Sequence, residues 1–343
     1  MAWASAPTLD TVAERAGVSR QTVSNALHRP ERLRSATRDR VFAAIAELGY
    51  RPSIPARQLA TRRAKAIAVA AHRPQPDGVS GLLLDAFLHG LADACRSSGH
   101  QVILYSTSAD DRDEIGPIED LLLTGSADAV VLTATHTGDQ RSMWLAQRRA
   151  PFCSFGRPWD TSPEGPEYWH DWVDVDGANG CEQAVEYLAA RGCRSIAFLG
   201  WPAGSGVGDD RRSGWHRAAA TLGVLAPIAP MACEDRSDAA EAAVRLAFEG
   251  DQAPDGLVCA SDTLALGAWR ATQHSPRPPR IVGFDATPVT AALGLASIGQ
   301  PVAQAARTCM DLLLPRLAGG VAPFRGVLLR PSLVDPGRGP TVT

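Results

Sequence analysis

Five polar side chains near the N-terminus lie close together in the sequence and are suited to contact DNA. They are Arg20, Gln21, Thr22, Ser24 and Asn25. They follow Ser19, which can cap a helix, so they occupy the exposed first turns of a helix predicted over residues 20–27. From there, guanidinium, amide and hydroxyl groups can reach phosphates and base edges in a major groove. An ordinary helical hairpin with a polar outer face is the alternative interpretation of this spacing.

Two more helices must hold that helix in place. Residues 8–19 indicate a helix that ends in a turn at Gly17, where a residue without Cβ adopts the left-handed conformation most easily. A third helix is predicted over residues 36–48, capped by Ser35 and ended by Gly49. The apolar residues expected to pack the first two helices around a small core are Val12, Ala13, Ala16, Val18, Val23 and Leu27.

The segment from Thr8 to Lys65 resembles the LacI/GalR (lactose-repressor-like) family of transcriptional regulators. The resemblance rests on the motifs TLDTVAERAGVS, QTVSNAL, AELGYRP and ARQLA, which follow one another with almost no gaps. It implies an all-α helix-turn-helix DNA-binding domain over residues 7–52, and a hinge helix and linker over residues 53–64. The residues that it implies as DNA contacts are Thr8, Ser19, Arg20, Gln21, Thr22, Ser24, Asn25, Arg38, Tyr50, Ala56, Arg57 and Leu59.

Position along the helix divides these contacts into two kinds. The side chains that point outward near its start are expected to contact bases, and they are Gln21, Thr22 and Asn25. The side chains that flank them are expected to hold phosphates, and they are Arg20, Ser24 and Arg38. The hinge at residues 53–60 is too short for a stable isolated helix, so we expect it to fold when two hinges of a homodimer meet on a near-palindromic operator. The resemblance implies that Leu59 then wedges between central base pairs.

The charge distribution also indicates a nucleic-acid partner. Residues 1–65 contain 12 Lys and Arg residues against 5 Asp and Glu residues, a net charge of +7. Because the whole chain carries −3, residues 66–343 carry −10. A basic N-terminal module on an acidic body is typical of a nucleic-acid-binding domain joined to a domain with another task.

The length and composition of the chain exclude several other classes of protein. A chain of 343 residues with 45% hydrophobic residues predicts two or three globular domains. We find no apolar run long enough for a membrane span and no signal peptide. The seven cysteines are scattered without a C-x-x-C motif, so we expect free thiols in a reducing cytoplasm and neither a metal site nor a cofactor. The motifs of nucleotide-binding, hydrolase and metalloprotease sites are missing, so we expect no enzyme.

Residues 65–343 alternate between short apolar strands and helices. Strands are predicted over residues 66–70, 101–105, 129–132, 172–176, 195–200, 256–260 and 280–284. Two successive βα runs of this kind predict an α/β body of two parallel-sheet subdomains. We place them at approximately 65–172 plus 302–328, and 173–301 plus 329–343. Ligands of such sheets bind beyond the carboxyl ends of the strands, so the expected site lies between the halves.

This body is similar to the periplasmic-binding-protein-like effector domain of the same family, through the motifs FGRP, DVD, RGCRSIAFLG, RRSGW, ASD and VGFD. Carried over by position, the resemblance implies effector contacts from Arg157, Asp176, Arg211, Ser261 and Asp285. Guanidinium donors and carboxylate acceptors suit a polyol, so a mono- or disaccharide or a derivative is the expected effector. The chain departs from the family pattern at Leu83, Leu84 and residues 293–300, which border the pocket and leave the effector's identity open.

Each of these side chains also has a structural interpretation. Arg211 and Asp285 are suited to a structural ion pair, and Asp176 to capping the following helix. Indole faces stack on sugar rings, and the tryptophans in this part of the chain are Trp159, Trp169, Trp172, Trp201 and Trp215. We expect Trp159 and Trp172 to line the site and Trp215 to lie in the core, whereas packing is the alternative for most of them.

Overall fold

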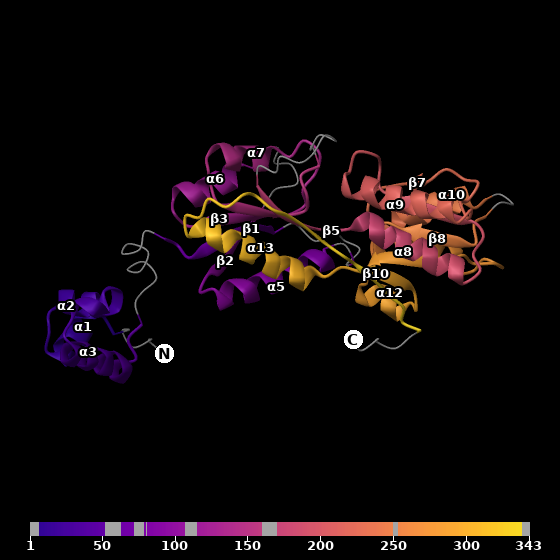
Figure 1. The fold of residues 1–343 in the computed structure, drawn as a ribbon. Coiled ribbons are helices and arrows are strands. Elements are labelled where there is room, and N and C mark those ends of the chain that lie inside the picture. Colours follow the sequence, from indigo (N-terminus) through magenta and orange to yellow (C-terminus); the bar gives the residue numbers. More distant parts are fainter. Residues whose placement is uncertain are drawn as a thin grey trace. The chain divides into compact units, whose positions relative to one another are not determined.

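The computed structural model describes residues 7–51, 63–71, 79, 81–106, 115–159, 170–249 and 253–337. The chain forms two compact units, Met1–Ala64 and Lys65–Thr343 (Figure 1). No helix in the described ranges is long and apolar enough to cross a membrane.

The first unit is a small helical domain with a single apolar core. The helices in its described residues are α1 (Leu9–Ala16), α2 (Arg20–His28), the 3-10 helix η1 (Pro30–Arg32) and α3 (Ser35–Leu48). Gly17 ends α1 in the left-handed conformation with φ of 64°, and the Ser19 hydroxyl accepts from the backbone N–H of Thr22 at the start of α2, both as predicted. The predicted cap at Ser35 is wrong, because α3 already begins at this residue and Arg34 precedes it without a side-chain cap.

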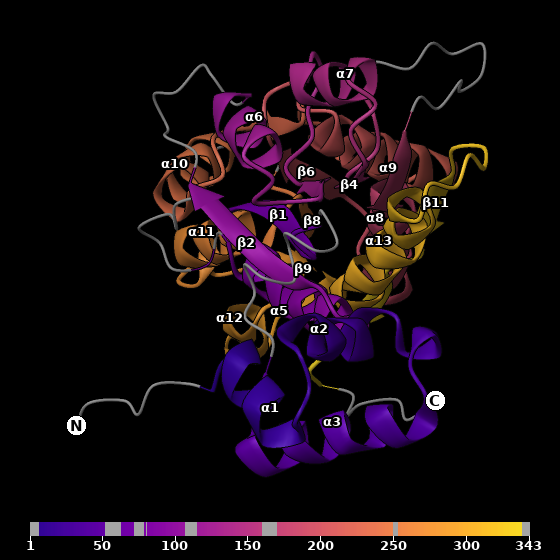
Figure 2. The same ribbon diagram turned by 90° about the vertical axis from the view of Figure 1, so that its left-hand side faces the viewer.

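The first half of the body is built on a six-stranded, fully parallel sheet with the order β11-β5-β4-β3-β1-β2. The edge strand β2 stands in front in Figure 2. The strands are β1 (Ala66–Ala71), β2 (Gln101–Ser106), β3 (Ala129–Leu132), β4 (Phe152–Phe155), β5 (Asp171–Val175) and β11 (Gly326–Leu329). The helices of this half are α5 (Leu82–Ser97), α6 (Gly116–Leu123), α7 (Gln140–Gln147) and α13 (Val302–Leu317), and α5 packs against α13.

The second half repeats this plan with the strand order β12-β10-β9-β8-β6-β7. The strands are β6 (Ile196–Gly200), β7 (Met231–Ala232), β8 (Gly256–Cys259), β9 (Arg280–Asp285), β10 (Ala296–Gly299) and β12 (Ser332–Val334). All pairs are parallel except β10 with β12. The helices are α8 (Gly177–Ala190), α9 (Val207–Thr221), α10 (Ser237–Ala247), α11 (Asp262–Thr272) and α12 (Pro288–Ala292).

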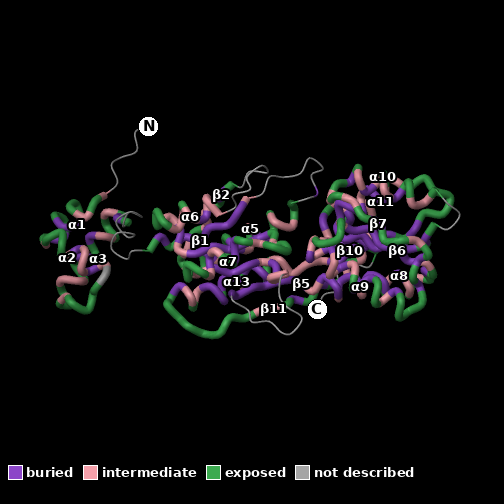
Figure 3. The backbone as a smooth tube through the Cα atoms, turned by 90° about the horizontal axis from the view of Figure 1, so that it is seen from above, coloured by how far each residue is buried: buried purple, intermediate pink, exposed green. Residues whose placement is uncertain are grey.

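The chain passes between the two sheets at three points of the described body. It leaves the first sheet after β5, returns between β10 and α13, and crosses again between β11 and β12. The first crossing lies after β5, whereas the predicted boundary at residue 172 falls inside this strand. The predicted boundary between residues 328 and 329 also falls inside a strand, because Leu329 is the last residue of β11 in the first sheet. The inner strands, such as β1 and β6, are buried because helices cover both faces (Figure 3).

Candidate functional site

Polar side chains of α2 form one exposed surface of the first unit. Gln21 is exposed, and its Nε2 atom donates a 3.2 Å hydrogen bond to Oδ1 of Asn25 one turn later. The hydroxyls of Ser19 and Thr22 lie 2.9 Å apart at the start of the same helix. Arg20 is also exposed and lies 3.6 Å from Asp10 in a surface ion pair. These groups keep free donors and acceptors toward solvent, as contacts to bases and phosphates require.

The other residues expected at the DNA have mixed positions. Thr8 caps α1 and exchanges hydrogen bonds with Thr11, and Arg38 lies on α3 beside Asp39. Tyr50 is a core residue with 7% of its surface exposed, and burial raises the pKa of its phenol although Arg20 partly offsets the effect. The hinge residues Ala56, Arg57 and Leu59 lie outside the described part of the chain, as does Trp169.

In the second half of the body, Arg211 lies where β8 and β9 end. Only 6% of Arg211 is exposed, and its Nη1 atom donates to the carbonyl of Ala260 directly after β8. The guanidinium carbon lies 3.7 Å from the centroid of the Phe284 ring on β9 and 5.4 Å from that of Trp201. The Nε atom of Arg211 is buried without a hydrogen-bond partner, and so is the indole N–H of Trp201. A buried donor of this kind normally has an acceptor, so this part of the protein can take a ligand with oxygen atoms.

Asp285 ends β9 beside these groups. Its backbone is in the sparsely populated region at φ of 117°, and its Oδ1 atom accepts a 2.6 Å hydrogen bond from Gln300. Burial raises the pKa of Asp285 to about 7; Arg211 and Gln300 lower it, whereas Asp262 and Asp235 raise it. No ion pair joins Asp285 to Arg211 among the described residues, so the alternative of a structural ion pair is wrong.

Ser261 and the buried Asp262 support this edge of the sheet. The Ser261 hydroxyl caps α11 by accepting from the N–H of Leu264, and it donates a 2.5 Å hydrogen bond to Asp235. Asp262 is fully buried, and the groups that donate to its carboxylate are the hydroxyls of Ser297 and Thr290 and the N–H of Thr287. These bonds tie the start of α11 to β10 and to the segment that follows β9, so Asp285 is held on a rigid base.

In the first half, Arg157 follows β4, and its guanidinium group is bonded to other side chains of the protein. Its Nε atom lies 2.6 Å from Asp174 and its Nη2 atom 3.4 Å from Asp210, a residue of α9 in the second half. Its guanidinium lies 4.8 Å from the centroid of the Trp159 ring. The carboxylate of Asp176 accepts a 2.9 Å hydrogen bond from the N–H of Asn179, so Asp176 is the helix cap that the sequence also suggested.

The expected site residues are therefore only partly brought together. Arg211, Ser261 and Asp285 converge at the ends of neighbouring strands. Trp172, by contrast, is 7% exposed inside β5, where a Cβ on Gly326 would lie 2.2 Å from its ring, so it packs the sheet. The nearby residues that the sequence analysis did not select are Trp201, Asp235 and Gln300. Trp201 was among the tryptophans considered for sugar stacking, and Gln300 falls in the unusual segment 293–300, whereas no sequence signal marked Asp235.

The described residues contain no group of three or more His, Cys, Asp or Glu side chains that could hold a metal ion. Six of the seven free cysteines are buried, and Cys233 is half-buried.

Comparisons with known proteins identify the family. Residues 8–53 match the model of bacterial regulatory proteins of the lacI family, and residues 185–336 match that of a periplasmic binding protein-like domain. The chain is 30% identical over 331 residues to the HTH-type transcriptional regulator CelR of Thermobifida fusca, covering 94% of this chain and 95% of the relative. The chain belongs to the LacI family. The regulator is also 27% identical over 321 residues to the HTH-type transcriptional repressor CytR of Escherichia coli (strain K12), covering 92% and 91% of the two chains.

Solved structures agree with this assignment. The lac repressor dimer bound to operator and the anti-inducer ONPF superposes with a TM-score of 0.77 at 25% identity, covering 96% of this chain and 98% of the other. A CelR-cellobiose complex superposes with a TM-score of 0.68 at 26% identity and the same coverage. The resemblance stated from the sequence is thus confirmed, as are the fold class and the role of a helix-turn-helix transcriptional regulator.

Proposed function

We propose that this regulator is a repressor whose affinity for operator DNA is set by a mono- or disaccharide, or a close derivative, bound between the two halves of its body. The observation that carries the proposal is the buried Nε atom of Arg211, which has no hydrogen-bond acceptor in the protein. Asp285 and Trp201 lie next to this guanidinium. A sugar hydroxyl can accept from Arg211 and donate to Asp285, while an indole covers its C–H face. The relative CelR has been solved with cellobiose, a ligand of this class.

The effector controls DNA binding only if it prefers one arrangement of the body over another, with a coupling of about 1–3 kcal/mol. Rotation of one half against the other is the motion that a site between them favours. We further propose a homodimer on a near-palindromic operator, as in the lac repressor dimer bound to its operator. In this dimer Leu59 of each hinge wedges into the minor groove, although the hinge lies outside the described residues.

We also propose that the chain acts in the cytoplasm by binding and not by catalysis. Ser154 and His170 resemble a nucleophile and a base, because Oγ of Ser154 lies 3.1 Å from Nε2 of His170. Both side chains are buried, however, and the Ser154 hydroxyl donates to the carbonyl of Gly156. Burial also lowers the pKa of His170 to about 4, which makes it a poor base at neutral pH.

The test is a gel shift on the DNA upstream of the gene, at several salt concentrations and with a panel of sugars. We expect a specific complex whose affinity falls with salt, and a sugar that both changes that affinity and raises the melting temperature of the protein. A protein that binds the sugar but shifts all DNA sequences equally would contradict the assignment as a specific repressor.

A further inference from the structure

Arg157 connects the two halves of the body. It follows β4 of the first sheet, yet its Nη2 atom lies 3.4 Å from Oδ2 of Asp210 on α9 of the second half. Both side chains are about one-fifth exposed, so water screens their attraction only in part. The bond from Arg157 to Asp174 in its own half is shorter, at 2.6 Å. The guanidinium therefore belongs to the first half, and the contact with Asp210 is the one that a relative movement of the halves would break.

A second contact lies beside this ion pair. Trp159 comes from the same segment as Arg157, and a Cβ on Gly206 of the second half would lie 2.5 Å from its ring. Gly206 has φ of 70° and directly precedes α9, the helix that carries Asp210. Close packing of backbone on an indole explains the glycine at this position, because any larger residue would clash. An apolar contact and an ion pair thus join the same two segments.

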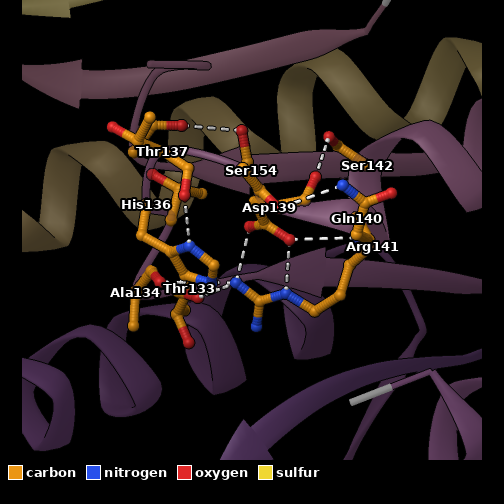
Figure 4. Close-up of polar contacts among 12 residues, drawn as sticks. Thr133, Ala134, His136, Thr137, Asp139, Gln140, Arg141, Ser142 and Ser154 are labelled. Atoms are coloured by element: carbon orange, nitrogen blue, oxygen red, sulfur yellow. Dashed lines mark hydrogen bonds and ion pairs between the residues drawn. The ribbon is translucent and has the colours of Figure 1, made fainter. Parts of the chain in front are cut away.

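Arg157 is held firmly in the first half. Its own carbonyl accepts a 3.1 Å hydrogen bond from the Thr135 hydroxyl, in the segment that follows β3. That segment is fastened by Arg141, which pairs with Asp139 at 2.7 Å and donates to the carbonyls of Thr133 and Ala134 (Figure 4). The Asp139–Arg141 pair is almost completely buried, and a buried ion pair with satisfied hydrogen bonds makes a rigid base.

Asp210 is held in the second half in the same way. Its Oδ2 atom accepts a 3.0 Å hydrogen bond from the N–H of Ala178 in the first turn of α8. A Cβ on Gly177 would lie 3.0 Å from the same oxygen, which shows how closely α8 approaches the carboxylate. Because both partners are fixed to their own halves, the distance between Arg157 and Asp210 reports the arrangement of the two halves and not the flexibility of two side chains.

We propose that the Arg157–Asp210 ion pair and the Trp159–Gly206 contact form a clasp that stabilises the present arrangement of the two halves and must open when they rotate apart. Arg157 and Trp159 are then positioning residues of the regulatory motion, and they are not contacts to the effector. The clasp itself is a property of the body and does not depend on the proposed function. The inference rests on the proposed function only in that the function decides which activity the motion of the halves controls.

The chain offers a matched pair of variants for the test. Asp210→Asn removes the charge that faces Arg157, but it keeps an oxygen for the N–H of Ala178 and leaves Arg157 paired with Asp174. Asp209→Asn is the control, because Asp209 is the preceding residue of α9 and pairs with Arg212 within the same helix. Both variants change one carboxylate to an amide on one helix, so their difference isolates the contact between the halves.

The distance between the halves is measured by pulsed electron paramagnetic resonance on the full chain, without DNA or sugar. The labelled protein is mixed with an excess of unlabelled protein, so that the distance within one protomer is recorded. Spin labels are attached at the exposed sites Met143→Cys on α7 and Leu246→Cys on α10, with the half-buried Cys233 replaced by Ala. We expect a single short distance in the parent protein and in Asp209→Asn. In Asp210→Asn we expect a several-fold larger share of a second, longer distance.

The double variant Arg157→Gln, Asp210→Asn should give the same distances as Asp210→Asn alone, because the ion pair between the halves is already absent in the single variant and the Arg157–Asp174 pair lies within the first half. The proposal is overturned if Asp210→Asn matches the parent, or if Asp209→Asn lengthens the distance equally. Since the measurement contains no operator and no effector, its failure is distinct from a failure of the gel shift.

Discussion

The side-chain amide of Gln300 donates a 2.6 Å hydrogen bond to the carboxylate of Asp285. Asp285 ends β9 and Gln300 directly follows the adjacent parallel strand β10, in which Gly299 pairs with Asp285. One oxygen of Asp285 is thereby occupied, and the amide fixes the plane of the carboxylate. The proposed effector site thus contains a positioning residue next to its acceptor.

Changing Asp285 should abolish the response to the sugar and spare DNA binding. We expect Asp285→Ala to lose the thermal shift with the cognate sugar and to keep the affinity for operator in its absence. Gln300→Ala should weaken sugar binding by roughly 10- to 100-fold, because the carboxyl group of Asp285 loses the amide that orients it toward the sugar. Asp238→Ala, on an exposed turn of α10, is the control. A wild-type thermal shift in Asp285→Ala would place the sugar elsewhere.

The stability of the body should fall as the pH rises toward neutrality. The pKa of Asp285 is about 7 in the folded protein and 3.8 ordinarily, because burial, Asp262 and Asp235 outweigh Arg211 and Gln300. Between these values the folded state holds a proton that the unfolded state has lost. This contribution to the free energy of unfolding is therefore complete below the lower value and is lost as the pH passes about 7.

This pH dependence is checked by urea unfolding at several pH values. In the parent protein Asp285 should contribute a slope of up to about 1.4 kcal/mol per pH unit over that range, and Asp285→Asn should remove it. Asp93→Asn, on the exposed surface of α5, should keep the slope. Parallel curves for the parent and Asp285→Asn would show that Asp285 titrates normally.

Two neighbouring residues of α2 should differ in what they contribute to DNA binding. Gln21→Ala should relax the sequence preference at one operator position by about 1–3 kcal/mol, since an amide that contacts a base edge is lost. Arg20→Ala should weaken binding to all sequences alike and reduce the salt dependence, since a phosphate contact is lost. Affinities for a set of operator variants at two salt concentrations separate the two cases. An equal, uniform loss in both variants would refute the assignment.

The close packing of α8 on α9 should make Gly214 sensitive to the smallest addition. A Cβ at this position would lie 2.1 Å from the carbonyl oxygen of Ala178, and backbone cannot move aside easily. We expect Gly214→Ala to lower the free energy of unfolding by about 1–3 kcal/mol, measured by urea unfolding. Gly337→Ala, whose Cβ would find its nearest neighbour at 3.4 Å, should be close to neutral. Equal stability of the two variants would contradict the close approach.

The local elements of this protein and their order follow from its amino-acid sequence alone. Ser19 caps α2 and Gly17 ends α1 because these are preferences of single residues for a backbone geometry, which need no distant partner. The alternation of apolar strands and amphipathic helices likewise fixed the α/β class, since each strand must be buried on both faces. The motifs of α1, α2 and the hinge identified the family without any coordinates.

Which of the candidate residues meet depends on the packing of the folded chain. Gln300 reaches Asp285 because β10 lies beside β9. Trp172 packs on Gly326, 154 residues later in the chain, because β5 lies beside β11. Arg157 bonds to Asp210 only because two sheets approach each other. Such contacts depend on strand order and on long-range packing, whereas a sequence pattern records only the preferences of residues that are near one another along the chain.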